Sequence, residues 1–402
     1  MKHIISKSCA DAQAYIVPFR AGSPRSVSIT PEIDAAVDLA INGSFGGNLG
    51  ETYAMTLPAG DKLTSIILLG LGADRLSVRD IHTKAAQAFK QAKQLGARHV
   101  AIMLDQLSEL SESFELFGAL ARLPQLAGYT NSGLKSNPEN KSFEQVAFVT
   151  AADGLDAALS EAVATARGTI IARRLCNLRS NEQTPQSLAE DAAALGKEYG
   201  FDVQLFDKVA IEELGMESFL SVARGAHNTP PVLIVMRYLN GGDSPRIGLV
   251  GKGIVYDSGG YSIKTTPGMK NMFDDMGGAA AVIGAMTAVA DQKLKANVIG
   301  VIAACENKIA ADAYVPGDII GSMSGKTIEV ISADAEGRLT LADAVTYIQR
   351  KESCRFVADI ATLTGSAKTA VGKYSAAVLT NNEELYASAR EASRLSAEKI
   401  WR

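Results

Sequence analysis

The sequence predicts an α/β protein, in which a smaller N-terminal α/β domain is joined by a helix to a larger C-terminal α/β domain with a central mixed sheet. The chain has 402 residues, of which 47% are hydrophobic and 21% are charged, enough to bury more than one core. Short apolar segments alternate with helical patterns, and this alternation is typical of layered α/β folds with mostly parallel strands. Two domains are therefore expected.

The N-terminal domain is placed at residues 1–155. Strands are predicted at 15–19, 65–71 and 99–104, and a helix is predicted at 78–95. Ser77 is expected to cap the start of this helix, and Gly96 lies where a C-terminal cap belongs. Residues 130–145 are rich in Asn, Ser, Gly, Lys and Pro, which predicts an exposed loop. This half of the sequence shows no group of residues typical of a catalytic site.

An alanine-rich helical pattern over 155–175 predicts the connection between the domains. We place the linker helix at 156–178 and the larger domain at 179–402. Thr184 and Pro185 are expected at the N-cap and first position of the next helix. Strands are predicted beyond it at 232–236, 247–250, 298–303 and 356–360.

Composition restricts the class of partner and the compartment. A net charge of −4 gives no overall attraction to nucleic acid or to anionic lipid, so neither is expected as a partner. The apolar runs are too short to span a bilayer, and the N-terminus lacks the apolar core of a signal peptide. The cysteines are dispersed without a Cys-x-x-Cys pair, which favours reduced thiols; they are Cys9, Cys176, Cys305 and Cys354. A cytoplasmic protein acting on small substrates is predicted.

Two glycine-rich segments are similar to nucleotide-binding motifs but do not match them. The segment 321–327 is one residue short of the phosphate-loop pattern, and 327–331 has the character of a strand, whereas a phosphate loop opens a helix. Residues 70–72 lack the third glycine of a dinucleotide fingerprint. Nucleotide binding is not expected at either segment.

Charged residues in apolar surroundings mark the second half as the site of chemistry. Lys252, Asp257 and Lys264 lie in an otherwise apolar segment, where burial requires ion pairs or a bound metal. Asp275 follows on a glycine-bounded turn before a helical run at 279–290. A structural cluster of ion pairs and a metal site are both compatible with this spacing.

A second group of charged residues lies at 334–338. Asp334 and Glu336 are separated by one residue, so in extended or loop backbone both side chains point to the same side, as two ligands of one ion require. Arg338 would continue the alternation. The histidines lie far apart without a His-x-x-x-His pair; they are His3, His82, His99 and His227. Any metal centre is therefore expected to be built from carboxylates, which suit hard divalent ions.

These segments together resemble the leucyl (cytosol) aminopeptidase family of two-metal exopeptidases. The matching motifs are Asp257-Ser258-Gly259-Gly260, Asp275-Met276-Gly277-Gly278-Ala279-Ala280, Ser322-Met323-Ser324-Gly325-Lys326-Thr327, Asp334-Ala335-Glu336-Gly337-Arg338-Leu339 and Ala361-Thr362-Leu363-Thr364-Gly365. The order and spacing of the charged residues fit as well. The resemblance covers the whole second half, and the first half only in general plan.

The resemblance implies a function and a residue for each role. One divalent ion, Mn²⁺ or Zn²⁺, would be held by Asp257, Asp334 and Glu336. The second would be held by Lys252, Asp257, Asp275 and Glu336. Lys264 would stabilise the developing oxyanion, and Arg338 would hold a bicarbonate that shuttles protons. Residues matching the pocket for the first side chain of the peptide are Met272, Thr362 and Gly365. The implied substrates are short peptides with a free N-terminus and a leucine-like first residue, and the implied assembly is a homohexamer.

The sequence also departs from the family pattern. Ser332-Ala333 replaces the usual Asn-Thr, and Tyr261 replaces a smaller aliphatic residue. The chain ends at Arg402, where family members continue, so the catalytic domain is expected to be incomplete, as a fragment or a natural truncation. Two alternatives stay open: a DNA-associated or scaffold protein on the same fold, and a non-peptide amide hydrolase using the same two ions.

Overall fold

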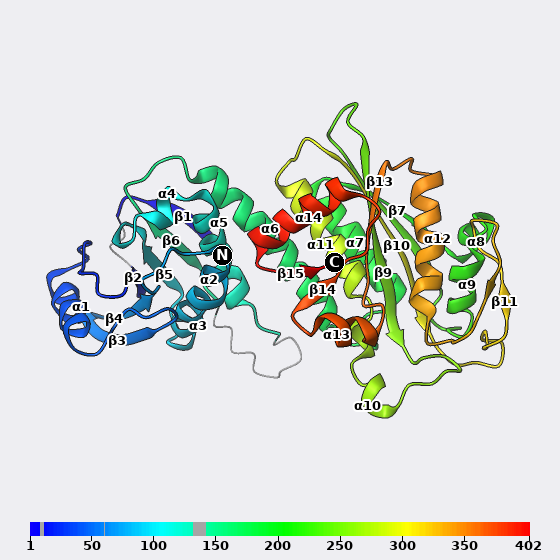
Figure 1. Ribbon diagram of the computed structural model, residues 1–402, viewed down its shortest axis with the longest axis horizontal. Helices are drawn as coiled ribbons and strands as arrows, with labels where there is room; N and C mark the ends of the chain where they lie inside the picture. The colour runs from blue at the N-terminus through cyan, green and yellow to red at the C-terminus, as the bar shows by residue number, and fades with distance from the viewer. Residues whose placement is uncertain (9–11, 60, 132–141) are drawn as a thin grey trace. The chain divides into compact units, whose positions relative to one another are not determined.

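The computed structural model describes residues 1–8, 12–59, 61–131 and 142–402 (Figure 1). Cys9 and most of the loop predicted at 130–145 lie outside these described residues. The contacts divide the chain into two compact units. Unit 1 contains Met1–Ala166 and Ser366–Arg402, and unit 2 contains Arg167–Gly365.

Unit 1 is built on a six-stranded sheet in the order β1-β6-β5-β2-β4-β3. Its strands are β1 (Lys2–Ser6), β2 (Ala14–Phe19), β3 (Thr52–Ala59), β4 (Lys62–Gly70), β5 (His99–Met103) and β6 (Gln145–Val149). Neighbouring strands are parallel except β3, which runs antiparallel to β4 at the edge. The three predicted strands correspond to β2, β4 and β5.

Helices cover both faces of this sheet. They are α1 (Pro31–Gly43), α2 (Val78–Asp80), η1 (Ile81–Ala85), α3 (Ala86–Gln94), η2 (Leu104–Gln106), α4 (Glu109–Glu112) and α5 (Phe114–Gly128). One core joins α3 and α5 to β2 and β4 through Phe89, Phe117 and Ile67. The other packs α1 on the opposite face, where alternate strand residues point. The helix predicted at 78–95 forms as α2, η1 and α3, and a capping box between Ser77 and Asp80 begins it.

The last part of unit 1 comprises α13 (Gly365–Val371), β14 (Ser375–Ala377), α14 (Glu383–Ser396) and β15 (Lys399–Trp401). Strands β14 and β15 pair in parallel. Arg394 forms ion pairs with Glu115 of α5 and with Glu391. These polar contacts, together with the hydrogen bond from Arg122 Nη1 to Leu395 O, attach α14 to α5.

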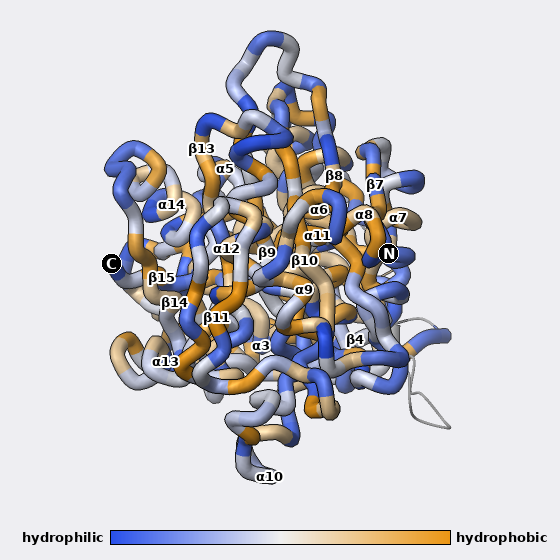
Figure 2. Tube along the Cα trace, turned by 90° about the vertical axis from the view of Figure 1, so that its right-hand side faces the viewer, coloured by the Kyte–Doolittle hydropathy of each residue, from blue (hydrophilic) through white to orange (hydrophobic). Residues whose placement is uncertain are grey.

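Unit 2 contains a mixed five-stranded sheet in the order β13-β9-β10-β8-β7. The strands are β7 (Asp202–Phe206), β8 (Val232–Leu239), β9 (Arg246–Asp257), β10 (Asn297–Asn307) and β13 (Phe356–Ile360). The pairs of β9 with β10 and β13 are parallel, and β8 is antiparallel to β10 and β7. All of β10 is buried, in keeping with its apolar sequence (Figure 2). A short antiparallel pair, β11 (Ile319–Ile320) with β12 (Ile328–Glu329), lies outside this sheet.

The helices of unit 2 form a layer on each face of the sheet, as Figure 1 shows. One layer contains α8 (Lys208–Glu213), α9 (Glu217–Ala223) and α12 (Glu336–Arg350). The other contains α7 (Pro185–Tyr199), α11 (Gly277–Asp291) and the end of α6 (Asp156–Asn177). Two short helices, α10 (Thr266–Met269) and η3 (Met272–Asp274), precede α11. Within the described residues, no helix combines the length and the apolar character needed to cross a bilayer.

Candidate metal centre

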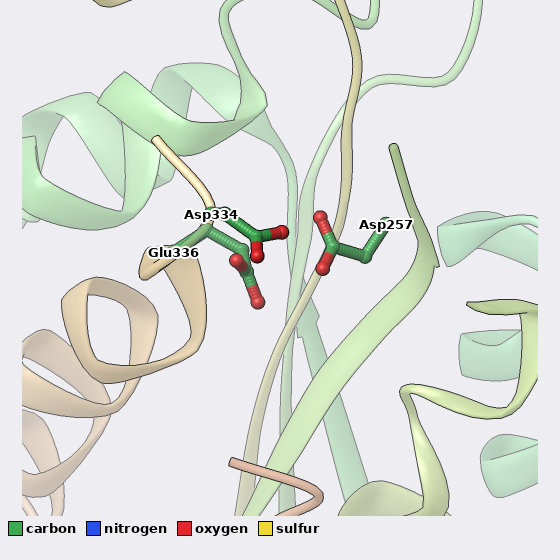
Figure 3. A group of neighbouring side chains, drawn as sticks. All are labelled: Asp257, Asp334 and Glu336. Atoms are coloured by element: carbon green, nitrogen blue, oxygen red, sulfur yellow. The ribbon is translucent and has the colours of Figure 1, made fainter. Parts of the chain in front are cut away.

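The parallel strands β9, β10 and β13 bring their carboxyl ends to one edge of the unit 2 sheet, where ligands commonly bind in α/β proteins. Asp257 is the last residue of β9. Glu336 is the first residue of α12, and Asp334 lies on the turn before it. Figure 3 shows the carboxylates of Asp334 and Glu336 directed toward that of Asp257. One ligand oxygen from each of the three lies within 4.8 Å of the others.

The predicted convergence of Asp334 and Glu336 is found, but its cause differs from the one expected. Extended alternation would carry Arg338 to the same side. Instead α12 begins at Glu336, so the alternation stops there and the side chain of Arg338 is exposed. A carboxylate in the first turn of a helix is stabilised by the peptide dipoles. No hydrogen bond or ion pair of Arg338 is found within the described part of the chain.

Lys252 forms the centre of a deeply buried cluster. Its Nζ lies 2.8 Å from Asp275 Oδ2 and 2.9 Å from Glu336 Oε1, and it donates a hydrogen bond to the carbonyl oxygen of Thr362 at 3.1 Å. The side chains of Lys252, Asp275 and Glu336 are 3%, 6% and 2% exposed. Asp275 approaches because α11 begins at a glycine pair, where a Cβ on Gly278 would lie 2.0 Å from the carbonyl oxygen of Ile360.

Lys264 neutralises the other side of the site. Its Nζ lies 2.7 Å from Asp257 Oδ2 and also pairs with Asp334 Oδ1. The side chain of Asp257 is 3% exposed, whereas Asp334 is 38% exposed and faces solvent. The two lysines therefore each bind two carboxylates, and of the four carboxylates only Asp334 is solvated.

The charges in this cluster do not balance, because two ammonium groups face four carboxyl groups. Burial raises the pKa of Asp275 although the charge of Lys252 opposes the shift. Burial also lowers the pKa of Lys252, but Asp275 and Glu336 raise it by more, so the amine of the metal-free protein is charged. Glu336 Oε2 is buried without a hydrogen-bond partner among the described residues. An excess of buried anionic oxygens, one of them unpaired, fits the binding of divalent cations.

The three residues predicted to line the substrate pocket differ in how they are placed relative to this cluster. Thr362 follows β13, and its hydroxyl donates to Asp275 Oδ1 at 2.7 Å. Met272 is half-buried at the start of η3, three residues before Asp275. Gly365 begins α13, and a Cβ there would meet open space. Thr362 therefore contacts the charged cluster directly.

One contact of the cluster was missed from the sequence. Asn307, the last residue of β10, donates from Nδ2 to Asp257 Oδ1 at 2.8 Å and to the carbonyl oxygen of Ala333 at 2.9 Å. Its position at the end of an apolar strand, as Asp257 ends another, was the available signal. The carbonyl of Ala333 accepts a second bond from Tyr314 Oη at 2.7 Å, so an amide and a phenol side chain together hold the segment at Ser332-Ala333.

Comparison with known families agrees with this arrangement. The model described as "Cytosol aminopeptidase family, catalytic domain" matches residues 170–402, more than half of the chain. The model of the N-terminal domain of the same family matches residues 33–138. The chain belongs to the cytosol aminopeptidase family. The family prediction from the sequence is thereby confirmed, and the chain is a hydrolase of the metalloaminopeptidase type.

Curated relatives in this family extend over most of the chain. A probable cytosol aminopeptidase of Clostridium perfringens is 41% identical over 99% of this chain and 82% of its own length. A probable cytosol aminopeptidase of Fusobacterium nucleatum is 40% identical over 89% of this chain and 72% of its own length. Both relatives are longer than the part that the chain matches.

Two solved structures share the fold of this chain. A point mutant of tomato leucine aminopeptidase aligns with a TM-score of 0.86 and 30% identity, covering 100% of this chain and 81% of that one. The bottromycin maturation enzyme BotP in complex with manganese aligns with a TM-score of 0.83 and 27% identity, covering 98% and 81%. The predicted two-domain α/β fold is confirmed by these likenesses.

Proposed function

We propose that this cytosol aminopeptidase relative uses two divalent metal ions to remove the N-terminal residue, preferably leucine-like, from peptides. The observation that carries the proposal is a group of four carboxyl groups, three of them buried, with only two lysines to neutralise them. The name of the tomato relative supports the leucine preference, and the manganese complex of BotP supports a divalent ion. Mn²⁺ and Zn²⁺ are the ions proposed.

The proposed ligands form two overlapping sets, one for each ion. Asp257, Asp334 and Glu336 would hold one ion. Lys252, Asp257, Asp275 and Glu336 would hold the other, and Lys252 would have to coordinate as the neutral amine. Asp257 and Glu336 would serve both. Divalent ions bound there would polarise the scissile carbonyl and lower the pKa of a bound water.

The remaining site residues supply charge and shape. Lys264 is held by Asp257 and Asp334 with its ammonium group at the more open side of the cluster, where it can stabilise a developing oxyanion. Arg338 is an exposed cation on the first turn of α12, suited to hold bicarbonate. Met272, Thr362 and Gly365 are proposed to line the pocket for the first side chain of the peptide.

Several broader properties belong to the same proposal. We infer a cytoplasmic enzyme that acts on short peptides and assembles as a homohexamer. The functional domain boundaries proposed are 1–155, 156–178 and 179–402, and the charged cluster lies wholly within the last of these.

The test compares two substrates on the metal-stripped protein. Adding Mn²⁺ or Zn²⁺ should restore cleavage of a leucyl amide with a free α-amine, while the N-acetylated amide should stay intact because the free amine is needed for binding. Lack of cleavage with every divalent ion tried would reject the proposal. Equal cleavage of the acetylated substrate would favour a general amide hydrolase instead.

A further inference from the structure

We propose that Asn307 is a positioning residue that fixes the orientation of Asp257 and couples it to the segment carrying Asp334. This inference rests on the proposed metal site, since its consequence is the geometry of two metal ligands. Asn307 itself is given no role as a ligand. The argument depends on its amide, its backbone carbonyl and the glycine that faces it.

The amide group of Asn307 can adopt only one orientation. Nδ2 lies 2.8 Å from Asp257 Oδ1 and 2.9 Å from Ala333 O, and both of these atoms are acceptors. A flipped amide would place Oδ1 against two acceptors and lose both hydrogen bonds. The residue is 0% exposed, so water cannot replace either donor.

The backbone of Asn307 strengthens the same connection. Its carbonyl oxygen accepts from Ser258 N at 3.1 Å and from Ser258 Oγ at 2.8 Å. An irregularity in the pairing of β9 with β10, between Cys305 and Glu306, brings Asn307 opposite Asp257. Asn307 therefore holds both the side chain of Asp257 and the residue that follows it.

The opposite side of the Asn307 amide faces a glycine. Asn307 Oδ1 is buried without a hydrogen-bond partner among the described residues. Gly260 faces it with φ +56°, and a Cβ on Gly260 would lie 2.9 Å from Oδ1. The glycine leaves room for Oδ1 and so permits the amide orientation in which Nδ2 donates two hydrogen bonds.

The hydrogen bonds of Asn307 determine how the two carboxylate oxygens of Asp257 are directed. Oδ1 accepts from Asn307 Nδ2 and from Gly259 N at 2.9 Å, which leaves Oδ2 directed toward Lys264 at 2.7 Å. The bond to Ala333 O holds the residue before Asp334 at the same time. Losing the amide should let both carboxylates move, and outer hydrogen bonds of this kind typically change metal affinity by about 10–100-fold.

Tyr314 provides a matched control. Its hydroxyl donates to the same carbonyl of Ala333 at 2.7 Å and is equally buried, but no hydrogen bond to Asp257 is found for it among the described residues. Tyr314→Phe therefore loosens the segment before Asp334 without touching Asp257. Asn307→Leu keeps the branched shape at Cγ and removes the amide, and Asn307→Ala removes both.

The experiment measures Mn²⁺ affinity of the metal-stripped full chain by competition with a chromogenic chelator, and the visible absorption spectrum of the Co²⁺ form. Asn307→Leu or Asn307→Ala should weaken Mn²⁺ binding by about 10–100-fold and alter the Co²⁺ bands, while Tyr314→Phe changes affinity by less than about threefold. Wild-type protein that binds no divalent ion would reject the proposed function itself, separately from the role of Asn307.

The remaining outcomes decide the role of Asn307. Variants that keep the wild-type circular dichroism and bind Mn²⁺ as tightly as the wild type would overturn it. Equal losses in the Asn307 and Tyr314 variants would also overturn it, because the effect would then come from the segment at 333–334 alone. If neither Asn307 variant folds, the residue is structural and the positioning role is rejected.

Discussion

Replacing Lys252 by methionine tests how strongly the charged cluster depends on its buried cation. The substitution keeps most of the side-chain volume and removes the ammonium group, which lies 2.8 Å from Asp275 Oδ2 and 2.9 Å from Glu336 Oε1. Two carboxyl groups would then face each other in a site that excludes water. The metal-stripped protein should be the most sensitive form, because no other cation is available there.

The size of the effect can be estimated from burial. Removing one partner of a buried ion pair costs about 3–5 kcal/mol. Protonation of Asp275, whose pKa burial already raises, limits the loss to this range. For a domain of about 150–250 residues each kcal/mol corresponds to about 2–4 °C in Tm, so a fall of about 6–20 °C is expected for unit 2.

Lys264→Met is the matched control for this prediction. Lys264 is 17% exposed, and solvent can stabilise its partner Asp334, which is 38% exposed. Its other partner, Asp257, is 3% exposed but keeps hydrogen bonds from Asn307 Nδ2 and Gly259 N. The loss of Lys264 should therefore cost less than the loss of Lys252, which leaves two carboxyl groups that are 6% and 2% exposed. Calorimetry of the metal-stripped variants would compare the two directly. Equal shifts, or a loss below about 1 kcal/mol for Lys252→Met, would refute the reasoning from burial.

Three other substitutions give distinct outcomes. Glu336→Ala should abolish metal-dependent turnover, because the carboxylate proposed to serve both ions is lost; retained turnover would show that one carboxylate does not serve both. Lys264→Ala should lower turnover by about 10²–10³-fold with metal content unchanged, and loss of metal would reassign Lys264 as a binding residue. Burial, with the charge of Arg122, lowers the pKa of His82 from 6.5 to about 4, so the folded chain takes up this proton later than the unfolded chain as pH falls. Stability should therefore drop between these values by up to about 3 kcal/mol, and His82→Gln should reduce that slope; an identical dependence of Tm on pH would contradict the assignment.

The sequence predicts the elements whose signals are local and strong. The helix at 156–177 and the apolar strands β8 and β10 follow directly from helical periodicity and hydrophobic runs. Strand β9 was predicted only at 247–250, because Gly251, Lys252 and Gly253 have weak strand propensity. In the structure β13 pairs with β9 at 247–251, and β10 pairs with it as far as Asp257. Strand β7 was missed because it is an edge strand with little buried apolar surface.

In the charged cluster too, residues with a local sequence signal were predicted, and a residue that depends on strand pairing was missed. Lys252, Asp257, Asp275, Asp334 and Glu336 were selected from the sequence and lie together in the structure, although their role as ligands stays a prediction. Asn307 was missed, because its contact with Asp257 depends on an irregularity in strand pairing that no local pattern records. Arg338 is exposed on the first turn of α12, and the start of this helix at Glu336 cannot be read from one-residue spacing.

The central claim is that this cluster holds two divalent ions, and anomalous diffraction from crystals soaked in Mn²⁺ tests it most directly. The account predicts two manganese peaks in each chain, one among Asp257, Asp334 and Glu336 and one beside Lys252 and Asp275. A single peak, or two peaks away from these carboxylates, would contradict it.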